Sequence, residues 1–324
     1  MTNLRLYDNT RISAFRRCPR YYFFRHVLDW ETKTKKTALI FGSCWHAAQE
    51  IIWPMMVDKV DKHMIMAVAY EAWLAKWREE GMNYPLAYEE EKELAPRTPG
   101  HAQEMIAAYV DERYDSVSNG SIELISCEKA FVVPLDADDD TLFYVGKIDK
   151  VVRQRGRYRA IEHKTTTAYK KDGPFRSTFV DSFSPNSQVD GYLYALHMTY
   201  PGEVSGVWVD AALVHKTETG FLFVPVERQM KHLDAWLWGV RYWIDQIEAN
   251  TKHYEEACSV DDVYMAAFPQ NTNSCFDFNS ACSYLDLCKM WPNPIGKPVP
   301  PGYEVNKWDP LDHIDATDLL PKGE

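Results

Sequence analysis

A short turn between two apolar segments constrains the fold of this chain more than any other feature. Residues 142–152 and 157–167 are rich in β-branched and aromatic residues, and Arg155-Gly156 between them has the composition of a two-residue hairpin turn. Such a turn pairs Gln154 with Arg157 and, counted back along both strands, places Asp149 opposite Glu162. Directly opposed residues have Cβ atoms about 5 Å apart on one face of the sheet. The hairpin therefore predicts two neighbouring carboxylates.

A lysine joins this pair. Lys164 follows Glu162 by two residues, and the period of two along a strand puts both side chains on one face. Two carboxylates so close repel each other unless a positive charge lies between them. Carboxylate oxygens suit Mg²⁺ or Mn²⁺, which also bind phosphate oxygens, and the lysine could orient or deprotonate an attacking water. The alternative is that Asp149, Glu162 and Lys164 are solvated charges on the outer face of a hairpin.

The remaining chain predicts helices before this hairpin and a mixed arrangement after it. Helical periodicity runs through residues 43–57, 61–79, 100–118, 187–199 and 228–250. Further strands are expected at residues 122–135, 205–216 and 220–227. We predict three parts that interweave into one unit: a mainly helical part over 1–120, a core with the sheet over 121–250, and a loop-rich, Cys-rich cap with an acidic tail over 251–324.

Composition limits the class of protein. The 46% hydrophobic and 26% charged residues are typical of a globular chain. The net charge of −11 is unlike that of a protein that coats duplex DNA, although it leaves room for a local basic groove. No run approaches the roughly 20 apolar residues of a membrane span, and the N-terminus lacks a signal-peptide core, so we expect a cytoplasmic protein. Seven cysteines in that compartment do not predict a disulfide set.

Five short motifs occur along the chain: SAFRRCPRYYFFRH at residues 13–26, FGSCWHAAQE at 41–50, GKID at 146–149, EHK at 162–164 and QVDGY at 188–192. In this order they resemble the motifs of the PD-(D/E)XK nuclease superfamily. The RecB-like branch, with the AddB nuclease domain and the CRISPR-associated iron–sulfur exonucleases, is the most similar. The resemblance implies an α/β fold with a restriction-endonuclease-like mixed central sheet flanked by helices, an N-terminal helical part and a C-terminal Cys-rich cap.

The resemblance also implies a metal site. His46, Asp149 and Glu162 would bind Mg²⁺ or Mn²⁺, and the main-chain carbonyl of His163 would be a further ligand. Lys164 would be the catalytic lysine. Taken without the resemblance, His46 has the features of a packed or capped helix residue.

Three further residues are candidates near this site. Gln188 and Tyr192 are one helical turn apart, and the resemblance implies that they face the site and contact DNA or the lysine. Tyr192 alone would otherwise be a core residue. Glu128, at the end of the strand before the hairpin, is either a carboxylate for a second shell or a second metal, or an exposed strand charge.

Three cysteines near the C-terminal end have spacings that do not match the usual zinc pairs. Cys275, Cys282 and Cys288 need a fourth partner, for which Cys18 is the candidate. The resemblance implies that these four cysteines hold a [4Fe–4S] cluster, whose usual ligands are four thiolates. A zinc ion in the same cysteines and thiols without any cofactor are the alternatives.

Basic and aromatic residues alternate between residues 11 and 25, as a single-stranded nucleic-acid channel would require. The alternative is that the aromatic residues are core and the arginines a solvated helix face. With the resemblance, we predict a metal-dependent DNA nuclease, an exonuclease on single-stranded ends, with partner proteins of recombination or CRISPR adaptation. The other hypothesis is a catalytically silent nucleic-acid-binding or assembly subunit that keeps the nuclease fold.

Overall fold

The computed structural model describes residues 4–170, 173, 175–277 and 280–309, so the end of the predicted acidic tail, residues 310–324, lies outside it. The backbone divides into two compact units, each discontinuous in sequence. Among the described residues, the first unit contains those up to Thr34, Val132–Gly146 and those from Lys231 onward, and the second contains Lys35–Phe131 and Lys147–Met230. This grouping by compactness does not test the three consecutive parts expected from the sequence, which stay a prediction.

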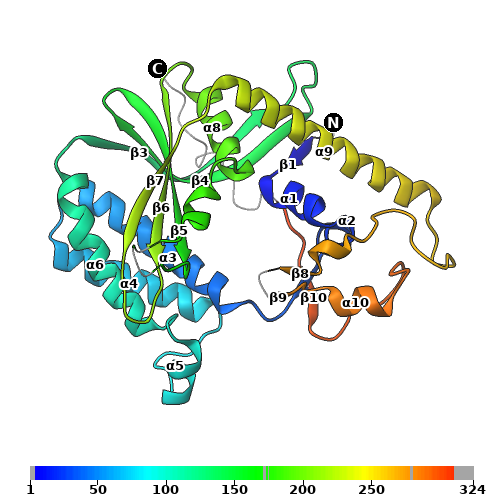
Figure 1. Ribbon diagram of the computed structural model, residues 1–324, viewed down its shortest axis with the longest axis horizontal. Coiled ribbons are helices and arrows are strands. Elements are labelled where there is room, and N and C mark those ends of the chain that lie inside the picture. The colour runs from blue at the N-terminus through cyan, green and yellow to red at the C-terminus, as the bar shows by residue number, and fades with distance from the viewer. Residues whose placement is uncertain (1–3, 171–172, 174, 278–279, 310–324) are drawn as a thin grey trace. The chain divides into compact units, whose positions relative to one another are not determined.

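The largest sheet among the described residues has six strands and is mixed (Figure 1). Its strand order is β1-β4-β5-β6-β7, and β3 pairs with β4. The pairs β1/β4 and β5/β6 are parallel, whereas β4/β5 and β6/β7 are antiparallel. The strands are β1 (Arg5–Tyr7), β3 (Ile122–Pro134), β4 (Leu142–Gln154), β5 (Arg157–Thr166), β6 (Val204–Leu213) and β7 (Phe221–Val226). The predicted mixed central sheet is confirmed.

Helices of the second unit pack on this sheet. The long helices α3 (Thr37–Val57), α4 (Lys62–Glu79) and α6 (Pro99–Ser118) surround a core centred on tryptophans that are wholly buried: Trp45, Trp53, Trp73 and Trp77. That core reaches the sheet at Val152 and Ile161. Helix α8 (Ser187–Thr199) contacts β5 and β6 and is capped by Asn186, whose side chain accepts the main-chain N–H groups of Gln188 and Val189. Two short helices, α5 (Tyr88–Leu94) and α7 (Ser177–Asp181), complete the unit.

Short elements form most of the first unit. Helix α1 (Asn9–Arg17) ends before Pro19, which begins α2 (Pro19–Tyr22), and the π-helical turn η1 (Phe23–Val27) follows. The long helix α9 (Met230–Ala257) precedes η2 (Thr272–Ser274), β8 (Phe276–Asp277), β9 (Ser280–Ala281) and α10 (Leu285–Met290). Strand β2 (Trp30–Thr32) pairs antiparallel with β10 (Tyr303–Val305), so early and late segments of the chain meet.

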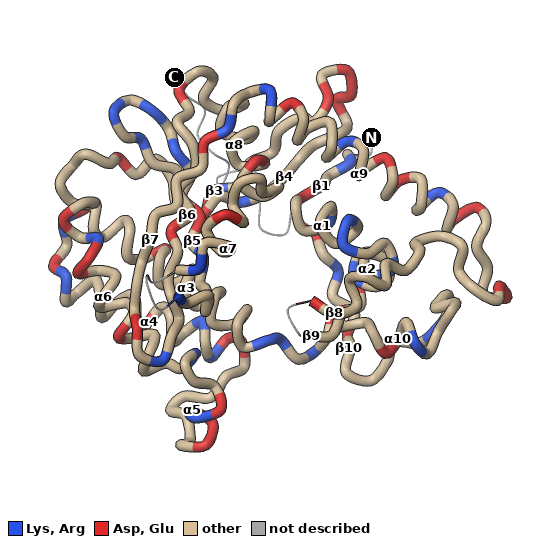
Figure 2. The backbone as a smooth tube through the Cα atoms, viewed as in Figure 1, with Lys and Arg blue, Asp and Glu red and all other residues tan. Residues whose placement is uncertain are grey.

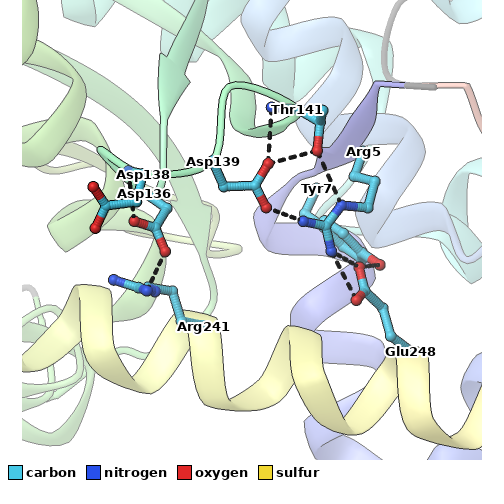
Figure 3. A network of polar contacts seen from close by, with 8 residues as sticks. All are labelled: Arg5, Tyr7, Asp136, Asp138, Asp139, Thr141, Arg241 and Glu248. Atoms are coloured by element: carbon cyan, nitrogen blue, oxygen red, sulfur yellow. Dashed lines mark hydrogen bonds and ion pairs between the residues drawn. The ribbon is translucent and has the colours of Figure 1, made fainter. Parts of the chain in front are cut away.

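Ion pairs tie β1 to α9 and to the β3–β4 connection (Figure 3). Both terminal oxygens of Glu248 accept hydrogen bonds from Arg5 at 2.8 Å, and Arg5 also pairs with Asp139. Arg241 on α9 pairs with Asp136. Lys and Arg mark α1 and α2, whereas α9 carries both acidic and basic residues (Figure 2). Among the described residues, no helix combines the length and apolarity needed to cross a bilayer.

Candidate active site

The hairpin of β4 and β5 has the register that its turn predicts. Arg155 and Gly156 both have positive φ, 53° and 76°, which fits a tight hairpin turn and favours glycine at the second position. Gln154 pairs with Arg157, and the ladder continues to Lys150 opposite Ile161. The strand pairing therefore brings the Asp149 end of β4 beside the Glu162 end of β5.

Asp149 and Glu162 are both buried, at 7% and 2% exposure. Oδ2 of Asp149 accepts the main-chain N–H of His163 at 2.8 Å. Oε1 of Glu162 pairs with the Lys164 ammonium and accepts Nε2 of Gln188 at 3.1 Å. Oε2 of Glu162 is also buried but accepts no hydrogen bond from the described residues. Oε1 of Glu128 is likewise buried without a hydrogen bond, whereas the Tyr192 hydroxyl also contacts the Glu162 carboxylate.

Gln188 connects three groups of the site. Its Oε1 accepts Nζ of Lys164 at 3.1 Å, and its Nε2 donates to Glu162 and, at 2.9 Å, to the hydroxyl of Tyr192. Residues 188 and 192 lie one turn apart on α8, which packs on β5. The structure therefore brings Gln188 and Tyr192 to the same face as Glu162 and Lys164.

A group of three metal-binding side chains lies beside these residues. Donor atoms of His46 on α3, Glu128 on β3 and Asp149 on β4 all lie within 4.8 Å of one another. Glu162 is not a member of this group of three, although Asp149 and His46 both act on its pKa. The ring of His163 points away from the side chains of Glu162 and Lys164 and packs against Trp53 and against the edge of the His46 ring, so its main chain is the part that contacts Asp149.

Glu128 is the residue that sequence reasoning left undecided. It has a φ of 52°, which is unusual for a non-glycine residue within a strand. Its carboxylate lies 2.9 Å from Nζ of Lys147, and burial together with Asp149 raises its pKa. A charged residue with left-handed backbone next to other acidic side chains is the signal that distinguishes it, but that backbone conformation cannot be read from sequence.

The surroundings shift the pKa values of the two carboxylates in opposite directions. Burial, reinforced by Asp149, raises the pKa of Glu162 despite Lys164 and His46. Burial alone would raise the pKa of Asp149, but His46 and then His163 and Lys150 hold it well below its usual value. Burial lowers the pKa of His46, yet Asp149 and Glu162 outweigh it and raise that pKa to about 9. The site is thus built to hold positive charge.

The four predicted cysteines line one cavity of the first unit. Its walls include Cys18, Cys275, Cys282 and Cys288. Cys18 lies between α1 and α2, where its sulfur accepts the N–H of Asn271 at 3.3 Å. Burial raises the pKa of Cys288 to about 11, which the neighbouring guanidinium of Arg20 opposes. The other cysteines, Cys44, Cys127 and Cys258, do not line this cavity.

The aromatic residues near the N-terminus are core residues of the first unit. Phe15, Tyr22, Phe23 and Phe24 are at most 3% exposed and pack on one another. Arg20 is also buried, and its guanidinium donates to main-chain carbonyls of Phe268 and Pro292. A base-stacking role for these four rings is therefore wrong, because they are unavailable to a ligand, whereas a nucleic-acid contact by the partly buried Tyr21 and the exposed Arg16 stays a prediction.

Fold and site together define a mixed α/β protein with buried carboxylates, an imidazole and a lysine gathered at a β-hairpin. The family model described as the PD-(D/E)XK nuclease superfamily matches residues 9–289, and the chain belongs to this superfamily. The predicted restriction-endonuclease-like fold is thereby confirmed, whereas membership of the RecB-like branch stays a prediction.

Two solved structures show weaker likeness. A provisionally named exonuclease from Eubacterium rectale has 15% identity and a TM-score of 0.49, covering 81% of this chain and 90% of that chain. The protein SSO0001 has 11% identity and a TM-score of 0.25, covering 58% of this chain and 80% of that chain. No curated protein matches the chain.

Proposed function

We propose that this protein is a Mg²⁺- or Mn²⁺-dependent deoxyribonuclease that hydrolyses phosphodiester bonds at the site of Asp149, Glu162 and Lys164. The observation that carries the proposal is the buried Oε2 atom of Glu162, which accepts no hydrogen bond from the described residues. A buried carboxylate oxygen without a partner is costly, and a bound cation would remove that cost. Hard oxygen donors with one imidazole are a suitable ligand set for these metals.

The ligand set that we propose consists of His46, Asp149, Glu162 and the main-chain carbonyl of His163. Glu128 is an additional carboxylate within reach of His46 and Asp149. When bound, the metal would act as a Lewis acid on a phosphate oxygen and lower the pKa of water.

We propose that Lys164 is the catalytic residue. Its ammonium pairs with Glu162, and Gln188 holds it from the other side through Oε1. An ammonium fixed in this way can stabilise charge that develops on the phosphoryl oxygens or orient the attacking water. Tyr192 orients Gln188 by accepting its Nε2–H.

The test of the nuclease is cleavage of end-labelled DNA with Mg²⁺ or Mn²⁺, with and without a chelator. Wild-type protein should degrade DNA only with the metal, and Glu162→Gln should lose at least about 100-fold of the rate, or about 2.7 kcal/mol of transition-state stabilisation. Retention of DNA without cleavage at every metal concentration would instead identify the catalytically silent binding subunit.

We also propose that the enzyme is an exonuclease that prefers single-stranded ends. This preference rests on the resemblance of the motifs to the RecB-like branch. The buried aromatic residues near the N-terminus do not support it, because their rings cannot stack on bases. Linear and circular single strands of equal length, together with a blunt duplex, separate the alternatives. Rapid loss of the linear single strand alone is expected, whereas equal cleavage of the circle would identify an endonuclease.

For the four-cysteine cavity we propose a [4Fe–4S] cluster. Four thiolate ligands match the usual set, and all four line one cavity. The choice of a cluster over a single zinc ion rests on the resemblance of the motifs to the iron–sulfur exonucleases of the superfamily.

The colour and metal content of the protein test this second site. Protein purified without oxygen should be brown and contain about four irons per chain. Colourless protein with one zinc per chain would establish zinc in the same cysteines.

A further inference from the structure

A chain of ionisable side chains lies on the opposite face of β5 from the proposed metal site. Lys150 and His163 are wholly buried, and Asp210 is 1% exposed. They come from three adjacent strands, β4, β5 and β6, and all belong to the second unit. The proposed reaction uses none of these three side chains, so their burial needs another explanation.

The contacts within this chain are specific. Nζ of Lys150 lies 2.9 Å from Nε2 of His163, and Nδ1 of His163 lies 3.1 Å from Oδ2 of Asp210. An ammonium can only donate, so Nε2 accepts, and the proton of the neutral ring is assigned to Nδ1, beside Asp210. The ring therefore lies between a cation and an anion in one orientation.

Side chains from helices α3 and α6 hold Asp210 in place. The hydroxyl of Tyr109 on α6 hydrogen-bonds to Asp210, and Nε1 of Trp53 donates to that hydroxyl at 2.9 Å. The guanidinium of Arg113 lies 3.7 Å from Oδ1 of Asp210. These partners fix the position of the Asp210 carboxylate, which in turn holds the His163 ring.

Such an arrangement is not the most stable way to fill a core. Replacing buried ion pairs by apolar side chains of similar volume is often neutral or stabilising. These polar contacts instead fix the orientation of the His163 ring and of its peptide group. The His163 peptide lies between Glu162 and Lys164, its N–H donates to Asp149, and its ring is held by Lys150 and Asp210. One residue is thus anchored on both faces of the sheet.

We propose that Lys150 and Asp210 are positioning residues that hold the His163 peptide, and through it Asp149 and Glu162, in the geometry that metal binding requires. The proposal rests on the proposed function of the site. Mutation of residues that hydrogen-bond to metal ligands and orient them typically lowers metal affinity or activity by about 10–100-fold. Lys150 and Asp210 are at most 1% exposed, so neither side chain is open to a substrate.

The experiment measures Mn²⁺ affinity by electron paramagnetic resonance, together with kcat, KM for DNA and melting temperature. Lys150→Met should weaken Mn²⁺ binding roughly 10–100-fold, leave KM nearly unchanged, and recover much of kcat at high Mn²⁺ concentration. Lys150→Arg retains a donor and should remain closer to wild type. Lys150→Met leaves Asp210 paired with Arg113 only. The double variant Lys150→Met/Asp210→Asn removes the charge at both ends of the contacts to His163, while Arg113 keeps its pairing with Glu112, and its Mn²⁺ affinity should still be low.

Glu248→Gln is the matched control. It breaks the hydrogen-bonded pair with Arg5 in the first unit (Figure 3) and should lower the melting temperature without changing Mn²⁺ affinity. If Lys150→Met and the double variant behave like this control, the positioning role is overturned. If Asp149→Asn and Glu162→Gln also bind Mn²⁺ like wild type, the metal site itself fails, which is a separate result.

Discussion

Nδ1 of His46 lies 3.3 Å from Oδ2 of Asp149. In the metal-free protein this pairing outweighs burial and raises the pKa of His46 to about 9, so its ring is protonated at neutral pH. A metal-binding imidazole must be neutral. The proton and the metal therefore compete for the same side chain.

We predict that Mn²⁺ binding at pH 7 releases about one proton from His46, and that apparent affinity falls up to tenfold for each pH unit below about 9. Calorimetric titration in two buffers with different ionisation enthalpies measures the released proton. His46→Asn is the control, because it removes this proton but not any released by Glu162. Equal proton release from both proteins would contradict His46 as a ligand.

Removing the charge of Glu162 should stabilise the metal-free protein while it abolishes activity. Burial and Asp149 raise the pKa of Glu162, so ionisation opposes folding, and this cost develops as the pH rises above the unfolded pKa. Glu162→Gln removes the charge at nearly constant volume. In chelator at pH 7, its melting temperature should rise by about 2 °C for each kcal/mol gained.

Asp149→Asn provides the opposite case. Burial alone would raise the pKa of Asp149, but the contact with His46 outweighs burial and lowers it. The ionised form of Asp149 therefore stabilises the fold at pH values above the unfolded pKa. The amide should lower the melting temperature of metal-free protein, and activity should again be lost. Shifts of the same sign in the two variants would contradict the electrostatic description of the site.

Lys164→Ala should reduce kcat by about 10²–10³-fold, the usual cost of removing a group that stabilises transition-state charge, with a smaller change in KM. Gln188→Ala should have a smaller effect, because Lys164 keeps its pairing with Glu162. Tyr192→Phe should have the smallest effect, since it removes only the hydroxyl that Gln188 contacts. A rate loss in Tyr192→Phe equal to that in Lys164→Ala would be incompatible with these roles.

Glu128 and Lys147 should affect metal binding with opposite signs. Glu128→Gln removes a carboxylate that lies with His46 and Asp149 and should weaken Mn²⁺ binding by about tenfold. Lys147→Met removes the ammonium 2.9 Å from Glu128, which competes with a metal, and should leave affinity unchanged or increase it. Tighter binding by Glu128→Gln would exclude Glu128 as a ligand.

Cys18→Ser should reduce the iron content and lower the melting temperature, because the cavity would lose one of its four thiols. Cys258→Ser is the matched control, since Cys258 is absent from the walls of the cavity, and its iron content should equal that of wild type. Iron analysis and visible absorption of protein purified without oxygen measure both. Unchanged iron in Cys18→Ser would remove Cys18 from the ligand set.

The hairpin could be predicted because its determinants are local. Arg155 and Gly156 form the turn, and strand periodicity then fixes which residues oppose each other. The helix at Ser187–Thr199 was predictable for the same reason, because apolar periodicity and a capping asparagine lie within one segment.

Partners that are distant in sequence could not be predicted. Tyr109 reaches Asp210 across 101 residues, and only the packing of α6 on the sheet brings them together. An aspartate within the apolar run VWVDAAL and a lysine directly after Asp149 were visible signals, but neither indicates its partner. The short strands β1, β2 and β10 were also missed, since each contains only three residues.

The pairing of β2 with β10 has a consequence for synthesis of the chain. Asn306 donates to Glu31 across 275 residues, which a ribosome adds over roughly tens of seconds. During that interval the nascent second unit can complete its tryptophan core, whereas Phe23 and Phe24 stay exposed until the late segments emerge. Chaperone demand should therefore fall on the segment that contains Phe23 and Phe24, and premature termination before Tyr303 should give an aggregating product.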